Sequence, residues 1–205
     1  PVVTFDSEWQ NSRQKAKVIV TKKEKDSDRV LEGGVFALCA KEDIKNTDGD
    51  VLVKADTIME QKATDKDGKI FFTADLPVGG SFYVKEVKAP AGFVTTEEVK
   101  EFTFEYAGAD VPEVTFEHTF ENEATIFEIT KSDLTTGVEL DGATLTVLDK
   151  DGNEIDKWTS VKGEPHIIKR LHVGETYILR EEFAPYGYLK AEEVEFTITD
   201  TAEIQ

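Results

Sequence analysis

The amino-acid sequence contains two copies of one pattern, and this internal repeat limits the folds open to the chain more than any other feature. The block Leu31-Glu-Gly-Gly-Val-Phe-Ala-Leu38 begins nine residues after Lys22. The matching block Leu140-Asp-Gly-Ala-Thr-Leu-Thr-Val147 begins nine residues after Lys131. Repetition at a fixed spacing indicates that one structural unit occurs twice in the chain.

A second pair of motifs follows at matching distances. The tetrapeptide Leu76-Pro-Val-Gly79 corresponds to Leu171-His-Val-Gly174. A glutamate comes ten residues after each leucine, at Glu86 and at Glu181. The agreement of both spacings predicts two homologous units in tandem.

A third, partial copy indicates where each unit begins and ends. Residues Pro1–Asn11 align without gaps to Pro112–Asn122, the segment that ends the first full unit. We therefore expect residues 1–12 to be the last strand of a preceding unit. Residues 13–123 are then a complete unit, and residues 124–205 are a unit that lacks its last strand.

The local pattern is that of short β-strands. Runs such as KAKVIVTK, GVFALCA, SFYVKEV and EEVEFTITD alternate apolar and polar residues, and DG and GG turns separate them. The only short helical pattern spans Lys54–Gln61, inside an insertion at Lys41–Lys62 that we expect to hold a short helix or a hairpin. Many short strands with regular turns predict an all-β sandwich or barrel.

Composition argues against several classes of partner. The chain has 24 basic and 42 acidic side chains, a net charge of −18, which disfavours nucleic-acid binding and docking on anionic membranes. No apolar run is long enough to span a bilayer, so no membrane insertion is expected. The single cysteine, Cys39, excludes an internal disulfide and a cysteine-rich zinc site.

Each unit places a lysine in its first strand and a glutamate before an Ala-Pro-x-Gly-aromatic turn. The segment that ends the first full unit closes on an asparagine, and the partial copy does the same. Together with the Leu-x-Gly and Leu-x-Val-Gly motifs, these residues resemble the Cna B-type (SpaA-like, prealbumin-like) domains of Gram-positive surface adhesins and pilins. The resemblance covers essentially the whole chain. It implies tandem Ig-like, prealbumin-like β-sandwiches of the Greek-key type.

In the family that the sequence resembles, the lysine amine and the asparagine carboxamide condense into an isopeptide bond, assisted by the glutamate. The resemblance makes Lys22, Glu86 and Asn122 one complete set. Lys131 and Glu181 form a second set without its asparagine. Glu182 is the neighbouring alternative to Glu181, but the spacing to the Ala-Pro turn favours Glu181.

Physical chemistry supports that assignment. Burial disfavours the charged form of a lysine, and only an unprotonated amine attacks a carbonyl carbon. Burial also favours the neutral form of a carboxyl group, so Glu86 is expected to relay a proton from the amine to the amide. Contact among the three groups removes most of the entropic barrier. The alternative is an uncross-linked sandwich in which the three residues form a buried polar cluster.

Asn11 leaves two interpretations open. In the first, the segment around it is a boundary effect that hangs on the surface or pairs lightly. In the second, residues 1–11 insert head-to-tail into the open edge of another copy's second unit, so that Asn11 meets Lys131.

We expect no cofactor and no metal. The acidic turns at Asn46–Asp50, Asp65–Gly68 and Asp149–Glu154 lack the ligand spacing of an EF-hand and are typical of hairpins. The three histidines, His118, His166 and His172, show no ligand spacing, and Trp9 and Trp158 are assigned to packing. No hydrolase motif or phosphate-binding loop is present.

These observations favour a structural function. The resemblance implies a stalk or backbone module of a cell-wall-anchored adhesin or pilus-like protein, secreted to the surface of a Gram-positive bacterium. Its expected partners are neighbouring repeats of the same protein. The cross-link is a single self-modification, so the chain is not expected to be an enzyme. The alternative is a ligand-binding adhesin module for host matrix or glycan, which an exposed aromatic cluster or a concave groove, especially around the insertion, would favour.

Overall fold

The structure is a computed structural model that describes residues 12–205. The described residues form the following strands: β1 (Lys15–Glu24), β2 (Val35–Ala40), β3 (Ile44–Lys45), β4 (Val51–Val53), β5 (Ile58–Ala63), β6 (Lys69–Phe72), β7 (Ser81–Lys88), β8 (Val99–Thr103), β9 (Glu113–Asn122), β10 (Ile126–Ile129), β11 (Thr144–Asp149), β12 (Glu154–Thr159), β13 (His166–Lys169), β14 (Thr176–Phe183) and β15 (Val194–Thr197). Within this part of the chain, no helical segment has the length and apolar character that crossing a bilayer requires. The predicted all-β fold is confirmed.

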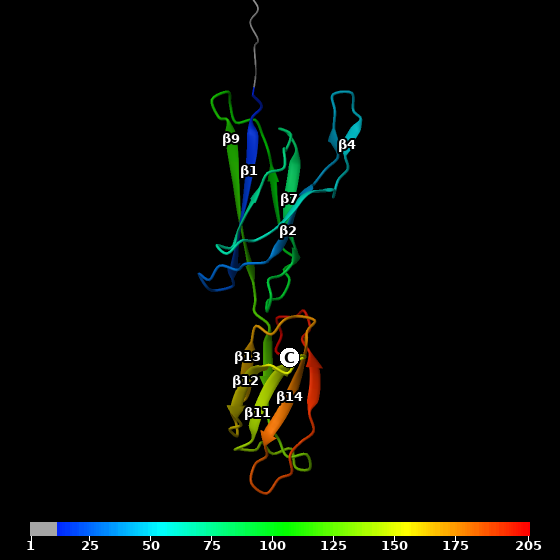
Figure 1. Cartoon of the computed structure of the whole chain (residues 1–205). Coiled ribbons are helices and arrows are strands. Elements are labelled where there is room, and N and C mark those ends of the chain that lie inside the picture. The colour runs from blue at the N-terminus through cyan, green and yellow to red at the C-terminus, as the bar shows by residue number, and fades with distance from the viewer. Residues whose placement is uncertain (1–11) are drawn as a thin grey trace, which may run out of the picture.

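Strands β1–β9 build the first unit, which is the upper body in Figure 1. A three-stranded sheet of order β6-β1-β9 faces a four-stranded sheet of order β5-β2-β7-β8. Apolar side chains from both sheets meet between them, because alternate residues of each strand point inward. The fully buried members of this core include Val18, Val20, Phe36, Leu38, Phe82, Val84, Phe104 and Phe120.

The first and last strands of this unit run in parallel. β1 pairs with β9 over its whole length, from Lys15 opposite Glu113 to Glu24 opposite Asn122. The chain therefore enters the unit at its upper end and leaves at its lower end (Figure 1). We use "upper end" and "lower end" in this sense for both units.

Strands β10–β15 build the second unit below the first. β10 pairs with β13, and a four-stranded sheet has the order β12-β11-β14-β15. Its core contains Ile129, Val147, Ile168, Leu171, Tyr177 and Ile198. On the side of β10 that corresponds to the β9 side of β1, Ile204 forms a parallel bridge with Ile126.

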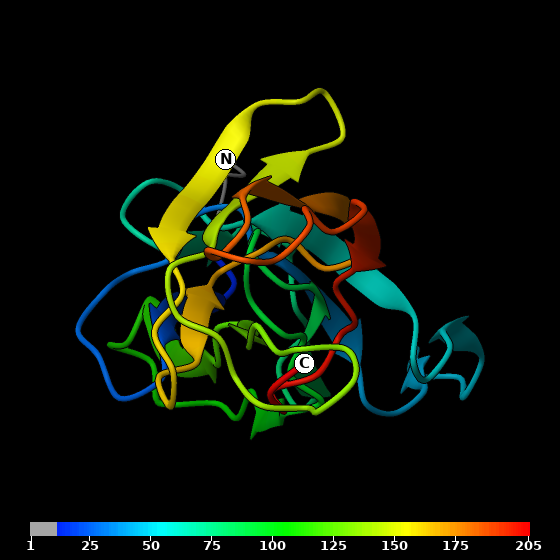
Figure 2. The ribbon, with the colours of Figure 1, turned by 90° about the horizontal axis from the view of Figure 1, so that it is seen from below.

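The insertion in the first unit is a hairpin. β3 and β4 pair antiparallel and project sideways from the body, as the view along the long axis shows (Figure 2). The helical pattern predicted at Lys54–Gln61 is wrong, because β5 begins at Ile58 and pairs with β2. Ladder pairing along the whole edge of β2 outweighs the weak local helical preference of this segment.

Candidate functional site

Three strands of the first unit bring Lys22, Glu86 and Asn122 together. Lys22 follows Val18 and Val20 on the inward face of β1, Glu86 lies on the inward face of β7, and Asn122 ends β9. Strand alternation thus places all three polar side chains on core-facing positions at the lower end of the unit.

The contacts among the three side chains are direct. Lys22 Nζ donates a hydrogen bond to Asn122 Oδ1 and lies 3.5 Å from Glu86 Oε1. Asn122 Nδ2 donates to both carboxylate oxygens of Glu86, at 3.0 Å and 2.9 Å. The amine therefore faces the carbonyl side of the amide, and the carboxylate faces its nitrogen.

This cluster is enclosed by the core. Lys22 is fully buried, Asn122 is 2% exposed and Glu86 is 7% exposed. The Lys22 amine lies 5.8 Å from the centroid of the Phe36 ring, which packs against Phe120 at 4.9 Å between centroids. Desolvation by burial lowers the pKa of Lys22 to about 8, although the Glu86 charge opposes the shift. A larger share of the lysine is therefore uncharged near neutral pH than in water.

Backbone contacts orient the glutamate. Glu86 Oε2 accepts a hydrogen bond from the N–H of Thr96 at 2.8 Å, ten residues along the chain. This contact fixes the carboxylate between the amine and the amide nitrogen. The sequence carried no signal for this contact, since it involves a backbone group in a loop.

The second unit repeats half of this arrangement. Lys131 Nζ lies 3.2 Å from Glu181 Oε1, and Glu181 Oε2 accepts from the N–H of Ala191 at 2.5 Å, again ten residues along. Glu181 is 2% exposed, whereas Glu182 is half-buried. Glu181 Oε1 is buried but accepts no hydrogen bond from the described residues, since the lysine meets it at ion-pair distance only.

The described residues supply no asparagine to this second site. Neither Lys131 nor Glu181 hydrogen-bonds an asparagine within residues 12–205, and Asn153 instead bonds Asp149 in a turn. Asn11 lies outside the described residues, so what the sequence predicts for it stays a prediction.

The acidic turns and His166 have local structural partners. Asp65 Oδ1 accepts two backbone N–H groups of its own turn, and Asp149 Oδ1 does the same. His166 stacks on Trp158 at 4.0 Å between ring centroids and contacts Asp156 at 2.8 Å. Among residues 12–205, no group of three or more His, Cys, Asp or Glu side chains is arranged to hold a metal ion.

Comparison with known proteins bears on the family and the fold. A family model described as "SpaA: Prealbumin-like fold domain" matches residues 16–119 and 125–205. Among solved structures, the Bacillus anthracis TIE protein is 26% identical over 93% of this chain, with a TM-score of 0.56. The C-terminal fragment of pilus adhesin SpaC from Lactobacillus rhamnosus GG is 16% identical over 92% of this chain and 83% of that chain, with a TM-score of 0.51, a likeness of fold alone.

The chain spans only part of two of the solved proteins that it matches. It spans 33% of the TIE protein and 62% of a streptococcal ancillary pilin, which is 26% identical over 95% of this chain with a TM-score of 0.41. No curated protein sequence matches the chain.

Proposed function

The chain belongs to the SpaA family of prealbumin-like fold domains, and from this premise we propose that it is a stalk module of a surface adhesin or pilus whose first unit is locked by a Lys22–Asn122 isopeptide bond. Family membership and the end-to-end arrangement of the two units support the stalk (Figure 1). The buried contact of Lys22, Glu86 and Asn122 is the observation that carries the bond.

The proposed reaction needs no outside reagent. The uncharged Lys22 amine attacks the Asn122 side-chain carbonyl carbon, and its proton passes to the Glu86 carboxylate. Glu86 then protonates Nδ2 of Asn122, to which it is already hydrogen-bonded. The carbon–nitrogen bond to Nδ2 breaks and ammonia leaves. One amide replaces another, and the glutamate returns to its starting charge.

Intact mass tests the proposal. The folded chain is expected to weigh about 17 Da less than its sequence mass, because one ammonia is lost. Peptide mapping should recover one branched peptide that joins Lys22 to Asn122. Asn122→Ala should restore the full mass, whereas Asn153→Ala, in an exposed turn, should retain the deficit. An unshifted mass of the folded wild-type chain contradicts the bond.

We propose unit boundaries that follow the repeat. The first unit covers residues 13–123 and the second covers residues 124–205, while residues 1–12 carry the sequence of a last strand. The separate hydrophobic cores of the two units support the division after residue 123. The two segments matched by the family model support it as well.

For the second site we propose that Lys131 and Glu181 receive an asparagine on a strand that runs parallel to β10. The parallel bridge between Ile204 and Ile126 supports this position for the strand. Asn11 of another copy carries the matching sequence. Covalent multimers on a denaturing gel, lost in Asn11→Ala, are the expected result. Monomers alone at high concentration contradict head-to-tail donation.

The cellular location and the functional class of the chain follow from the same proposal. As a stalk module, the chain works outside the cell, on a Gram-positive cell wall, and turns over no substrate. For the ligand-binding alternative, the hairpin of the insertion lacks one of the two expected features, an exposed aromatic cluster. The β3–β4 hairpin exposes Val51 and Leu52, and its residues 44–53 include no aromatic side chain.

A further inference from the structure

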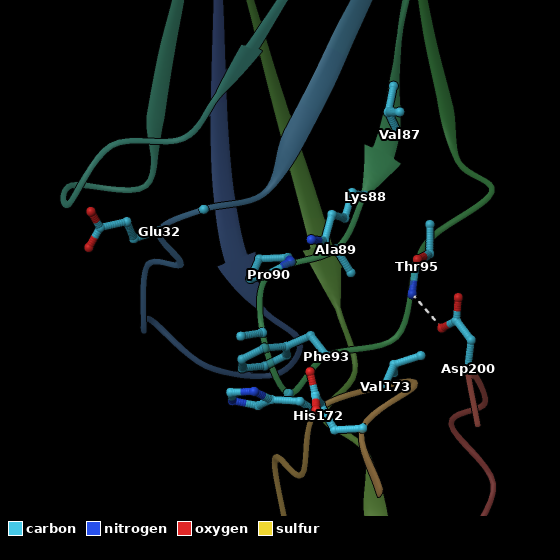
Figure 3. Close-up of a pocket in the computed structure, with 14 residues that line it drawn as sticks. Glu32, Val87, Lys88, Ala89, Pro90, Phe93, Thr95, His172, Val173 and Asp200 are labelled. Carbon is cyan, nitrogen blue, oxygen red and sulfur yellow. Dashed lines mark hydrogen bonds between the residues drawn. The ribbon is translucent and has the colours of Figure 1, made fainter. Parts of the chain in front are cut away.

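The Ala-Pro-x-Gly turn of the first unit docks onto the second unit. Thr125 N–H donates to the carbonyl of Gly92 at 3.1 Å, and Thr95 N–H donates to Asp200 Oδ1 at 2.9 Å. Phe93, from this turn, and His172, from the second unit, both line a cleft of about 510 Å³ between the units (Figure 3). The turn Ala89–Val94, which lies between Glu86 and Thr96 in the chain, therefore also forms a joint between the two units.

Close packing and charge both contribute to this joint. A Cβ added to Gly92 would lie 2.6 Å from the carbonyl oxygen of Arg170, so the two backbones are in contact. The Arg170 guanidinium bonds both carboxylate oxygens of Glu24, at 2.8 Å and 3.0 Å. Around the turn, Leu31 and Phe93 are each 4% exposed.

The second unit carries the same turn at its own lower end, where nothing in the described chain covers it. Tyr188, at the position of Phe93, is 45% exposed. Leu189 follows it at 95%, Tyr186 is fully exposed, and Leu134 from the neighbouring loop is also fully exposed. We name these four residues the lower-end patch. Asp133 stands beside it at the position that Glu24 occupies in the first unit.

We propose that the lower-end patch is a docking surface for the upper end of the first unit of a second copy. In the first unit, the equivalent lower-end surface is covered by the upper end of the second unit. By analogy, the upper end of another unit is the expected cover for the lower-end patch. The inference takes its head-to-tail direction from the proposed stalk function. It does not depend on either covalent bond.

The upper end of the first unit offers suitable partners. Its loops expose Val78, Tyr106 and Val111, at 38%, 64% and 36%. Asp75 occupies the position of Arg170 in the repeat, and it pairs with Arg13, which thereby places a guanidinium at the corresponding place. That cation can meet Asp133 of another copy, as Arg170 meets Glu24 within the chain.

Cross-linking between isotopically distinct copies tests the geometry. Lys190 lies in the lower-end loop of the second unit, and Lys15 begins β1 at the upper end of the first; both are exposed. These sites lie at opposite ends of the molecule (Figure 1), so a short amine-reactive reagent can join them only between copies. In a mixture of ¹⁴N and ¹⁵N chains carrying Asn11→Ala, we expect mixed-isotope Lys190–Lys15 peptides. Their absence at about millimolar protein overturns the proposal.

Sedimentation of variants tests whether residues of the lower-end patch contribute to self-association. Tyr186→Ser combined with Leu189→Ser should weaken self-association of the Asn11→Ala chain by about tenfold or more, since two apolar side chains lose their burial. Leu52→Ser, which changes a leucine of 66% exposure on the β3–β4 hairpin, is the matched control and should leave association unchanged. Association that is equal in both variants overturns the assignment. The mass deficit of the first unit, read on the same samples, reports separately on the proposed isopeptide bond.

Discussion

At the scale of single residues, burial decides what the Lys22 cluster can do. A charged lysine is costly in a core of aromatic rings, and here desolvation outweighs the attraction of Glu86 and lowers the lysine's pKa. The same enclosure keeps water from competing for the carbonyl of Asn122. The cluster is therefore more than a buried ion pair, because its amide presents one end to the amine and the other to the carboxylate.

Glu86→Gln separates the proton relay from mere packing. Glutamine keeps the size of the side chain but accepts a proton poorly, so bond formation should slow by about 10²–10⁴-fold. The mass of freshly folded protein, followed over hours, reads this directly. Glu98→Gln, which alters a nearby exposed carboxylate, is the matched control and should retain the wild-type mass loss. Full and immediate cross-linking in Glu86→Gln would contradict the role of Glu86.

His118 should make the first unit sensitive to acid. Its Nε2 is buried without a hydrogen-bond partner among the described residues, and desolvation, with Lys100 nearby, lowers its pKa below 6.5. Below that value the unfolded chain binds the proton more readily, so stability is full above about pH 6.5 and falls as pH drops through the folded pKa.

Denaturant unfolding at about pH 7.5 and pH 5.5 measures this dependence. His118→Gln should lose less stability on acidification than the wild type. His172→Gln, at an exposed position, should behave as the wild type does. Equal pH dependence in all three chains would show that His118 is not the sensor.

The sequence predicts the members of the Lys22 cluster but not its supports. Repeat spacing and strand alternation suffice to place Lys22, Glu86 and Asn122 on inward positions of their strands. The N–H of Thr96, which orients Glu86, is a backbone group, and every residue has one. Residue identity therefore carries no information about it, and only the loop's path in three dimensions brings it to the carboxylate.

At the scale of elements, the turn Ala89–Val94 adjoins the Lys22 cluster and also contacts the second unit. It follows β7, which carries Glu86, and its backbone rests on Arg170 of the second unit. The motif was visible in the sequence, but the partner on the other side of the joint was not, because Arg170 and Asp200 share no pattern with the turn. The β5 strand could not be predicted from its own sequence either, since its pairing with β2 is a tertiary contact.

Gly92→Ala should loosen the joint. The position has φ +81°, which strains alanine, and the new Cβ would meet the backbone of Arg170. Gly137→Ala, at φ +68° with open space around it, carries the strain without the contact. We expect Gly92→Ala to cost about 1–3 kcal/mol more than Gly137→Ala in thermal unfolding, and small-angle scattering to show a wider range of angles between units. Equal costs would mean that the contact at Arg170 is not limiting.

At the scale of the whole molecule, a Lys22–Asn122 bond would close a loop of 100 residues, worth about 4–5 kcal/mol if the chain-entropy estimate for disulfides applies. The same bond would remove that loop from the stretchable length of the chain. In single-molecule pulling from Ser12 to Gln205, Asn122→Ala should release about 33–36 nm more contour length than the wild type. Asn153→Ala is the control and should match the wild type. Equal lengths in the wild type and Asn122→Ala would contradict a closed loop.

The parallel pairing of β1 with β9 also bears on how such a protein can change over evolution. Tension between the two ends of the first unit runs along these two neighbouring strands, and β2–β8 lie to the side of that line. In the proposed stalk, segments off this line could lengthen without adding to the load on β1 and β9. The β3–β4 hairpin lies off this line, so a change in its length would leave the two strands proposed to carry the tension as they are.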